Sequence, residues 1–151
     1  MKKESIYLDT SVPSAMYDER VKERQETTVK FWESVLPKYH VSISEITLEE
    51  LKETVNENLR KKLMALTTDF KILKINKKIQ DLAGIYIENG IFSARYFADA
   101  LHVAIASFYE IAYLISWNFE HLVKVKTRRL VNSVNILEGL KEIEIISPLE
   151  L

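Results

Sequence analysis

The chain carries the run Ile6-Tyr7-Leu8-Asp9-Thr10-Ser11 close to its start. Its first three residues are apolar and compatible with a β-strand, and its last three are polar residues that favour a turn. A short apolar run that ends in this way is typical of a strand buried within a sheet. The stretch therefore predicts a buried strand over residues 5–9 with a carboxylate, Asp9, at the point where the strand ends.

Similar apolar runs recur along the chain and alternate with segments that have helical spacing of their apolar residues. Strands are expected at 5–9, 39–43, 70–75, 112–116 and 143–146, and helices at 20–36, 44–58, 59–67, 76–89, 94–110 and 128–138, with a short helix or turn at 118–123. Ser44 and Ser93 are expected to cap the helices that follow them. Alternating strands and helices predict parallel crossovers, with helices on both faces of the sheet. We therefore expect one α/β domain over residues 1–151, a three-layer α/β/α arrangement around a mostly parallel central sheet.

Composition restricts the class of protein. The 151 residues are 47% hydrophobic, enough for one core, and three Gly and three Pro leave no flexible linker. With no cysteine, the chain has no disulfide, thiolate nucleophile or Cys-based zinc site. No apolar stretch approaches the ~20 residues that span a bilayer, and the Met-Lys-Lys-Glu start lacks a signal-peptide core. These features predict a soluble cytoplasmic protein without a membrane partner.

Charge is nearly balanced over the whole chain but uneven along it. A formal net charge of −1 argues against a general nucleic-acid coat protein, which would be distinctly basic. The segment from Lys52 to Lys78, however, contains eight Lys and Arg but only three Asp and Glu, and residues 124–129 contain four basic residues and no acidic one. Such clusters are commonly solvated faces, but they also suit a basic rim around an acidic centre.

Three acidic positions are expected to meet at one edge of the sheet. Asp9 follows the first strand, Glu49 or Glu50 lies early in the helix after the second strand, and Asp99 lies in a later helix. Ligands of open α/β folds bind outside the carboxyl ends of the parallel strands. Carboxylates gathered there, with no cysteine nearby, are ligands for a hard divalent cation. The pattern predicts metal-dependent phosphodiester chemistry, with capping of the next turn as the structural alternative for Asp9.

Asp99 is the hardest of these residues to explain by structure alone. Residues 97–108 are apolar almost all round, with only Asp99, His102 and Ser107 as polar side chains. A helix of this kind is buried, and a buried carboxylate is costly unless it is paired or bound to a cation. His102 lies one turn beyond Asp99 and is either a further ligand or, more commonly for such a histidine, a core residue with its hydrogen bonds satisfied.

These acidic segments together resemble the PIN-domain family, most closely its small single-domain members, the VapC-type toxins. The matching segments, in order, are Tyr7-Leu8-Asp9-Thr10-Ser11, Ile46-Thr47-Leu48-Glu49-Glu50-Leu51 and Ala98-Asp99-Ala100-Leu101-His102-Val103-Ala104-Ile105-Ala106. The resemblance covers essentially the whole chain. It implies an enzyme, a hydrolase that acts as a Mg²⁺- or Mn²⁺-dependent endoribonuclease, with Asp9, Glu50 and Asp99 as catalytic and metal-binding residues. The family's Thr-x-x-Glu-Leu pattern selects Glu50 over Glu49.

The resemblance also bears on the segment Leu114-Ile115-Ser116-Trp117-Asn118-Phe119. The family commonly has a fourth acidic or amide residue there, a position that Asn118 takes. A neutral amide lowers the charge of the site and leaves open whether it holds one metal ion or two. Ser11 and Ser116 are candidates for orienting a ligand or water, with turn hydrogen bonds as the alternative. Glu120, nearby, is either a further contributor to the site or, more commonly for such a residue, a surface glutamate.

The family further implies an RNA substrate, a cognate antitoxin protein and, for many members, a homodimer. Lys124, Lys126 and Arg128, or the basic residues 60–62, are candidates for contacts to RNA phosphates, which would make binding dependent on salt.

Two other readings differ in chemistry. A haloacid-dehalogenase-type phosphatase also has an Asp after its first strand, but Ser11 stands where its second Asp belongs, and there is no Gly-rich phosphate loop. A catalytically inactive PIN-like module that binds RNA or protein is the main alternative to the nuclease.

Overall fold

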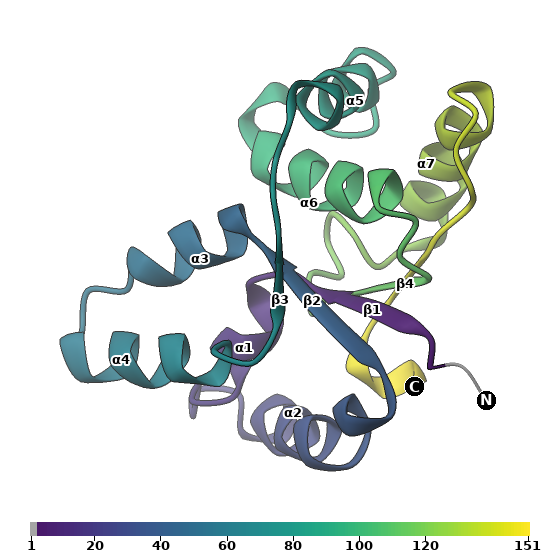
Figure 1. Cartoon of the computed structure of the whole chain (residues 1–151). Helices are drawn as coiled ribbons and strands as arrows, with labels where there is room; N and C mark the ends of the chain where they lie inside the picture. Colours follow the sequence, from purple (N-terminus) through teal and green to yellow (C-terminus); the bar gives the residue numbers. More distant parts are fainter. Residues whose placement is uncertain (1–2) are drawn as a thin grey trace.

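A five-stranded, wholly parallel sheet forms the centre of the structure, a computed structural model that describes residues 3–151 (Figure 1). The strand order is β3-β2-β1-β4-β5. The strands are β1 (Ser5–Leu8), β2 (His40–Ser44), β3 (Lys71–Leu73), β4 (Tyr113–Ile115) and β5 (Glu144–Ile146). The central strand β1 pairs with β2 on one side and with β4 on the other, so Asp9 leaves the sheet between these two neighbours.

Helices cover both faces of this sheet (Figure 1). On one face lie α5 (Lys77–Glu88), α6 (Phe97–Phe108) and α7 (Val125–Leu137), and on the other α1 (Ser11–Ala15), α2 (Lys22–Ser34) and the 3₁₀ turns Leu36–Lys38 and Pro148–Glu150. Side chains of β1 alternate between the two cores: Tyr7 packs with the α5–α7 layer, and Ile6 and Leu8 with the α1–α2 layer. The predicted three-layer α/β/α fold with a parallel sheet is confirmed.

Two shorter helices, α3 (Glu45–Lys52) and α4 (Glu57–Leu66), follow β2 in the chain and pack against each other. Ser44 caps α3 as expected, in a capping box with Thr47. The predicted end of the helix expected over residues 44–58 is wrong, since α3 ends at Lys52. A new helix, α4, begins after Asn56, whose side chain caps it by accepting the Leu59 N–H.

Smaller differences lie at other element ends. The expected helix 94–110 divides into a 3₁₀ turn at Ala94–Tyr96 and α6, and the Ser93 side chain makes no capping bond. Residues 118–123 form turns without a helix, and α7 begins at Val125, earlier than expected. Within residues 3–151, no helix has the length and apolar character needed to cross a membrane.

Candidate active site

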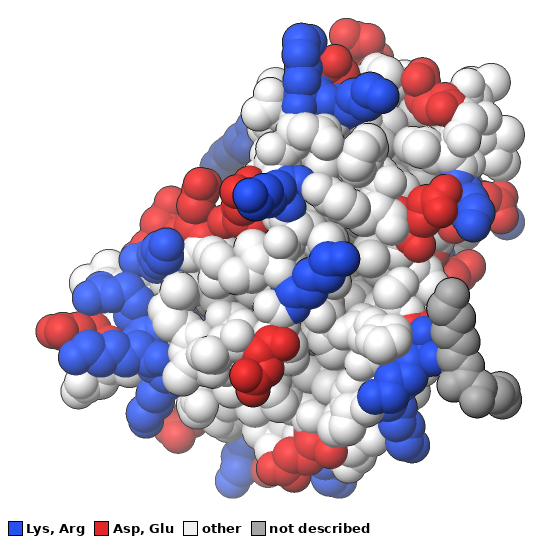
Figure 2. All heavy atoms as spheres, in the orientation of Figure 1, with Lys and Arg blue, Asp and Glu red and all other residues white. Residues whose placement is uncertain are grey.

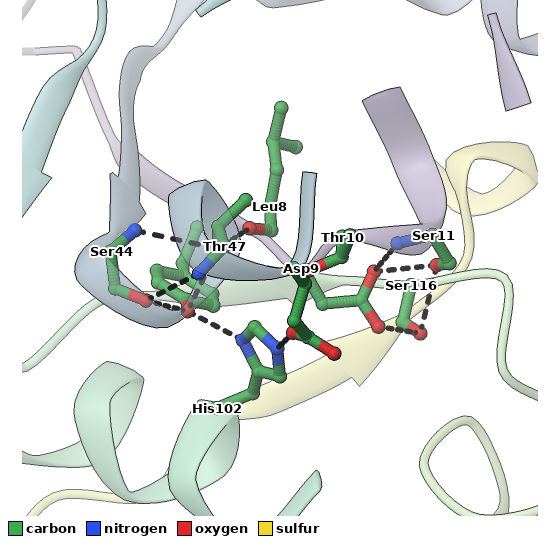
Figure 3. Close-up of polar contacts among 10 residues, drawn as sticks. Leu8, Asp9, Thr10, Ser11, Ser44, Thr47, His102 and Ser116 are labelled. Carbon is green, nitrogen blue, oxygen red and sulfur yellow. Dashed lines mark hydrogen bonds and ion pairs between the residues drawn. The ribbon is translucent and has the colours of Figure 1, made fainter. Parts of the chain in front are cut away.

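Asp9 is held between two serines just beyond the end of β1 (Figure 3). Its carboxylate is almost fully buried. The Ser11 hydroxyl donates to Oδ1 at 2.5 Å and the Ser116 hydroxyl donates to Oδ2 at 2.5 Å. Each serine oxygen in turn accepts a backbone N–H from the loop after β4, Ser11 from Trp117 at 2.8 Å and Ser116 from Asn118 at 2.9 Å. The serines therefore tie the Asp9 carboxylate to the ends of both β1 and β4.

Burial raises the pKa of Asp9, because removal from water disfavours the charged carboxylate. The nearby His102 and the hydrogen bonds from Ser11 and Ser116 act in the opposite direction. The net shift is upward, so the charge at Asp9 is only partly stabilised by the protein's own groups.

Glu50 reaches the same site from α3. Its Oε1 accepts a hydrogen bond from the Thr10 hydroxyl at 2.7 Å and pairs with His102 Nε2 at 2.7 Å. Both contacts are made to the same oxygen, which leaves Oε2 for another ligand. Burial alone would raise the pKa of Glu50, but His102 and Thr10 together hold it below its ordinary value. Glu49, by contrast, is exposed, so it is Glu50 that the structure brings beside Thr10 and His102.

His102 connects Glu50 to the core. It is 3% exposed, and its Nδ1 lies 2.6 Å from the Tyr7 hydroxyl, which lies 2.7 Å from the Ser44 hydroxyl. The expectation that His102 is a core histidine with satisfied hydrogen bonds agrees with these contacts. Sequence reasoning missed that one of its partners is Glu50, and it missed Tyr7 and Thr10 altogether. The only signal was a histidine one turn after an acid in an apolar helix.

Asp99 lies in the first turn of α6, half-buried, and accepts no hydrogen bond from the residues that the structure describes. Burial raises the pKa of Asp99, and the nearby charges of Asp9 and Glu50 raise it further, against the opposing effect of His102 and His121. The three predicted carboxylates therefore lie close enough to act on one another electrostatically. They do not form a tight cluster: within residues 3–151, no three His, Cys, Asp or Glu side chains are placed to hold a metal ion as they stand.

The remaining predicted residues lie around this centre or away from it. Asn118 follows β4, and its side-chain Oδ1 accepts the backbone N–H of His121 at 2.9 Å, so this oxygen serves the turn. Glu120 is exposed, as expected. Lys124 and Lys126 are exposed at the start of α7, whereas Arg128 is half-buried and donates to the Ile145 carbonyl at 3.0 Å.

The basic residues 60–62 belong to α4, and Figure 2 shows Lys and Arg side chains gathered over this side of the molecule, with acidic residues among them. A groove of about 770 Å³ lies elsewhere, at the amino ends of β1, β2 and β3. Its lining includes Trp32, Tyr39 and Phe70 but none of the three carboxylates. The three carboxylates thus lie at the opposite end of the sheet from this groove.

Comparison with known proteins agrees with this geometry. The family model for the PIN domain matches residues 6–125. No protein among the curated sequences matches the chain. Among solved structures, VapC20 of Mycobacterium tuberculosis, a toxin that cleaves the sarcin-ricin loop, has a TM-score of 0.62 at 18% identity, over 92% of this chain and 98% of that one. VapBC-1 of nontypeable Haemophilus influenzae has a TM-score of 0.62 at 18% identity, over 97% and 99%.

A toxin–antitoxin complex from Klebsiella pneumoniae has a TM-score of 0.58 at 18% identity, over 81% of this chain and 93% of that one. At this level of identity, these three structures establish likeness of fold only. The family model, however, extends over all three carboxylates and most of the chain. The prediction of the family is confirmed: this chain belongs to the PIN-domain family.

Proposed function

We propose that the protein is a metal-dependent endoribonuclease that hydrolyses RNA phosphodiesters at Asp9, Glu50 and Asp99, and that it is the toxin of a type II toxin–antitoxin pair. The observation that carries the proposal is Asp99, a half-buried carboxylate without a hydrogen-bond donor among the described residues, whose pKa is raised further by Asp9 and Glu50. Like charges collected at the carboxyl edge of a parallel sheet, where His102 and His121 offset them only in part at Asp99, suit a divalent metal ion.

The donor chemistry fits Mg²⁺ or Mn²⁺. The site offers carboxylate oxygens, which are hard ligands, and the chain has no cysteine to favour a softer metal. Asp9, Asp99 and Glu50 would hold the ion after their side chains move together, because the charges of Asp9 and Glu50 already act on Asp99 but the three do not form a metal-holding group as they stand. When bound, such an ion lowers the pKa of a water molecule and offsets charge on the phosphate.

The protein's own residues supply positioning. Ser11 and Ser116 fix both oxygens of Asp9, and Thr10 and His102 keep Glu50 ionised and fixed through one oxygen. A fixed carboxylate does not have to reorient as charge develops on the substrate, which is how preorganised groups accelerate a reaction. Exposed Lys124 and Lys126 would bind flanking phosphates of the RNA.

The toxin role draws on the solved structures, since one is a toxin that cleaves the sarcin-ricin loop and another is a toxin–antitoxin complex. An antitoxin is accordingly the protein partner we propose, and a second copy of this chain is proposed from the family alone. An inactive RNA- or protein-binding module is the second candidate. It is favoured by Asn118, which adds no charge to the site and uses its side-chain oxygen to cap a turn.

Incubation of a mixed structured-RNA pool with Mg²⁺, Mn²⁺ or EDTA tests the proposal. The variants are Asp99→Asn and a control, Asp81→Asn, which removes an exposed carboxylate of α5 that is paired with Lys77. We expect metal-dependent products from the wild type and from Asp81→Asn, and none from Asp99→Asn. Folded wild-type protein that binds RNA but cleaves none with either metal would favour the inactive module.

A further inference from the structure

A continuous row of buried hydrogen bonds runs from the core of the protein to Glu50. The Ser44 and Tyr7 hydroxyls are 2.7 Å apart, Tyr7 and His102 Nδ1 are 2.6 Å apart, and His102 Nε2 and Glu50 Oε1 are 2.7 Å apart. The row joins three separate parts of the sequence, which are β1, the consecutive elements β2 and α3, and α6 (Figure 3). Ser44, Tyr7 and His102 are all buried, so water does not compete for these bonds.

The direction of each bond follows from the groups at the ends. An ionised Glu50 only accepts, so His102 Nε2 carries the hydrogen between them. Tyr7 is fully buried and burial raises the pKa of its hydroxyl, so it keeps its proton and has one O–H to donate. A neutral imidazole that carries hydrogen on Nε2 presents Nδ1 as an acceptor, which matches the Tyr7 O–H. The Tyr7 oxygen then accepts from the Ser44 hydroxyl.

We propose that Tyr7 and His102 are positioning residues, which fix the imidazole as the neutral Nε2–H tautomer and thereby hold Glu50 by one oxygen, with the other directed to the metal and substrate. The consequence for catalysis rests on the proposed nuclease function, whereas the hydrogen bonds of the row and the tautomer of His102 do not depend on it. Because Glu50 is carried by α3 and is about one-third exposed, the two bonds to Oε1 are what restrict its side chain. Groups that orient a metal-binding residue typically change metal affinity or activity by about 10- to 100-fold when removed.

A second buried tyrosine in the same core serves as a matched control. Tyr86 is as fully buried as Tyr7, and its hydroxyl bonds to the side chains of Asn135 at 2.5 Å and Ser107 at 3.2 Å. Those partners are neutral and touch none of the three carboxylates. Tyr86→Phe therefore reports what the loss of a buried phenol hydroxyl does to stability alone.

The test uses four variants: Tyr7→Phe, Tyr86→Phe, His102→Gln and His102→Leu. Glutamine can accept from Tyr7 with its oxygen and donate to Glu50 with its nitrogen, as the proposed tautomer does, whereas leucine can do neither. The readouts are the imidazole nitrogen NMR signals of metal-free wild type, Mn²⁺ affinity by calorimetry, and kcat and KM on RNA.

We expect His102 to carry its hydrogen on Nε2 alone. Mn²⁺ affinity and kcat should fall about 10- to 100-fold in His102→Leu, fall less in Tyr7→Phe, and stay within a few-fold of wild type in His102→Gln and Tyr86→Phe. A hydrogen on Nδ1 in the wild type would overturn the proposal, and so would equal losses in His102→Gln and His102→Leu, or in Tyr7→Phe and Tyr86→Phe. The tautomer is measured by NMR without metal or RNA. A wild type that cleaves no RNA would therefore refute the nuclease function, and the NMR signals would still test whether Tyr7 and Glu50 fix the His102 imidazole.

Discussion

Removal of the Ser116 hydroxyl measures how much its hydrogen bonds, above all that to Asp9, contribute to the stability of the protein. Ser116 is fully buried, donates to Asp9 Oδ2 at 2.5 Å, and accepts the Asn118 N–H at 2.9 Å. Ser116→Ala removes both hydrogen bonds. Among the described residues, no other side chain donates a hydrogen bond to Asp9 Oδ2.

The expected loss of stability follows from these two bonds. A hydrogen bond to a charged group contributes about 1.5–3 kcal/mol, and a buried N–H left without an acceptor costs about 1–3 kcal/mol, some of which the loop recovers by moving. We therefore expect the free energy of unfolding of the metal-free protein to fall by about 3 kcal/mol at neutral pH.

The loss should depend on pH in a defined direction. The folded pKa of Asp9 is raised above its unfolded value, so its contribution to stability is fully present below the unfolded pKa and is lost as pH rises through the folded pKa. Ser116→Ala removes a donor that favours the charged form, which raises the folded pKa further. The difference between variant and wild type should therefore grow from about 1 kcal/mol, when Asp9 is protonated, to its full value when Asp9 is charged.

Urea unfolding in EDTA over a series of pH values from about 4 to 8, which covers the range above an ordinary Asp pKa, measures this difference. Ser107→Ala is the control, because Ser107 is equally buried but bonds only to the neutral side chains of Tyr86 and Asn135. Its loss of stability should not change with pH. If both variants lose the same stability at every pH, the reasoning that Ser116 stabilises a buried carboxylate is refuted.

Three further outcomes follow from the same structure. Asp99→Asn should raise the melting temperature of the metal-free protein at neutral pH, because it removes the charge of a half-buried carboxylate whose pKa is raised. The same variant should lose stabilisation by Mn²⁺, and an unchanged response to Mn²⁺ would exclude Asp99 as a ligand. Wild type should gain about 2.7 kcal/mol at a Mn²⁺ concentration 100 times the Kd, reversed by EDTA, as thermal unfolding would record. Lys124→Ala with Lys126→Ala should weaken RNA binding and lower its salt dependence in filter-binding assays, whereas Arg128→Ala should lower stability, because its guanidinium binds the Ile145 carbonyl.

The inner strands β1, β2 and β4 were predictable from the sequence because they are largely buried, and such a strand is a short apolar run between turn residues. β1, β2 and β4 lie within a residue or so of their expected positions. The ends of helices were harder to predict, since they depend on local competition. The helix expected over residues 44–58 stops at Lys52 because the side chain of Asn56 begins a new helix, and both segments have helical spacing. The order of the strands, with β1 at the centre, depends on tertiary packing that no local pattern contains.

The choice between Glu49 and Glu50 shows the same limit within the site. The two residues flank the apolar stripe of their helix about equally, so periodicity does not separate them. What distinguishes Glu50 is Thr10, 40 residues away, and His102, 52 residues away. The link from His102 to Tyr7 spans 95 residues. Contacts at this separation are set by how the elements pack, so local sequence patterns indicated the carboxylates but not the groups that hold them.

The three carboxylates differ in what they require from a cation. Glu50 has a lowered pKa, since His102 and Thr10 already stabilise its charge, so it remains ionised and in place without metal. Asp9 and Asp99 have raised pKa values, because burial outweighs the protein groups that face them. A divalent ion bound as proposed would therefore gain little from Glu50 beyond a fixed ligand, and would gain most by offsetting the charge of the two aspartates. It follows that metal affinity should depend on pH mainly through Asp9 and Asp99, which must lose their protons as the ion binds.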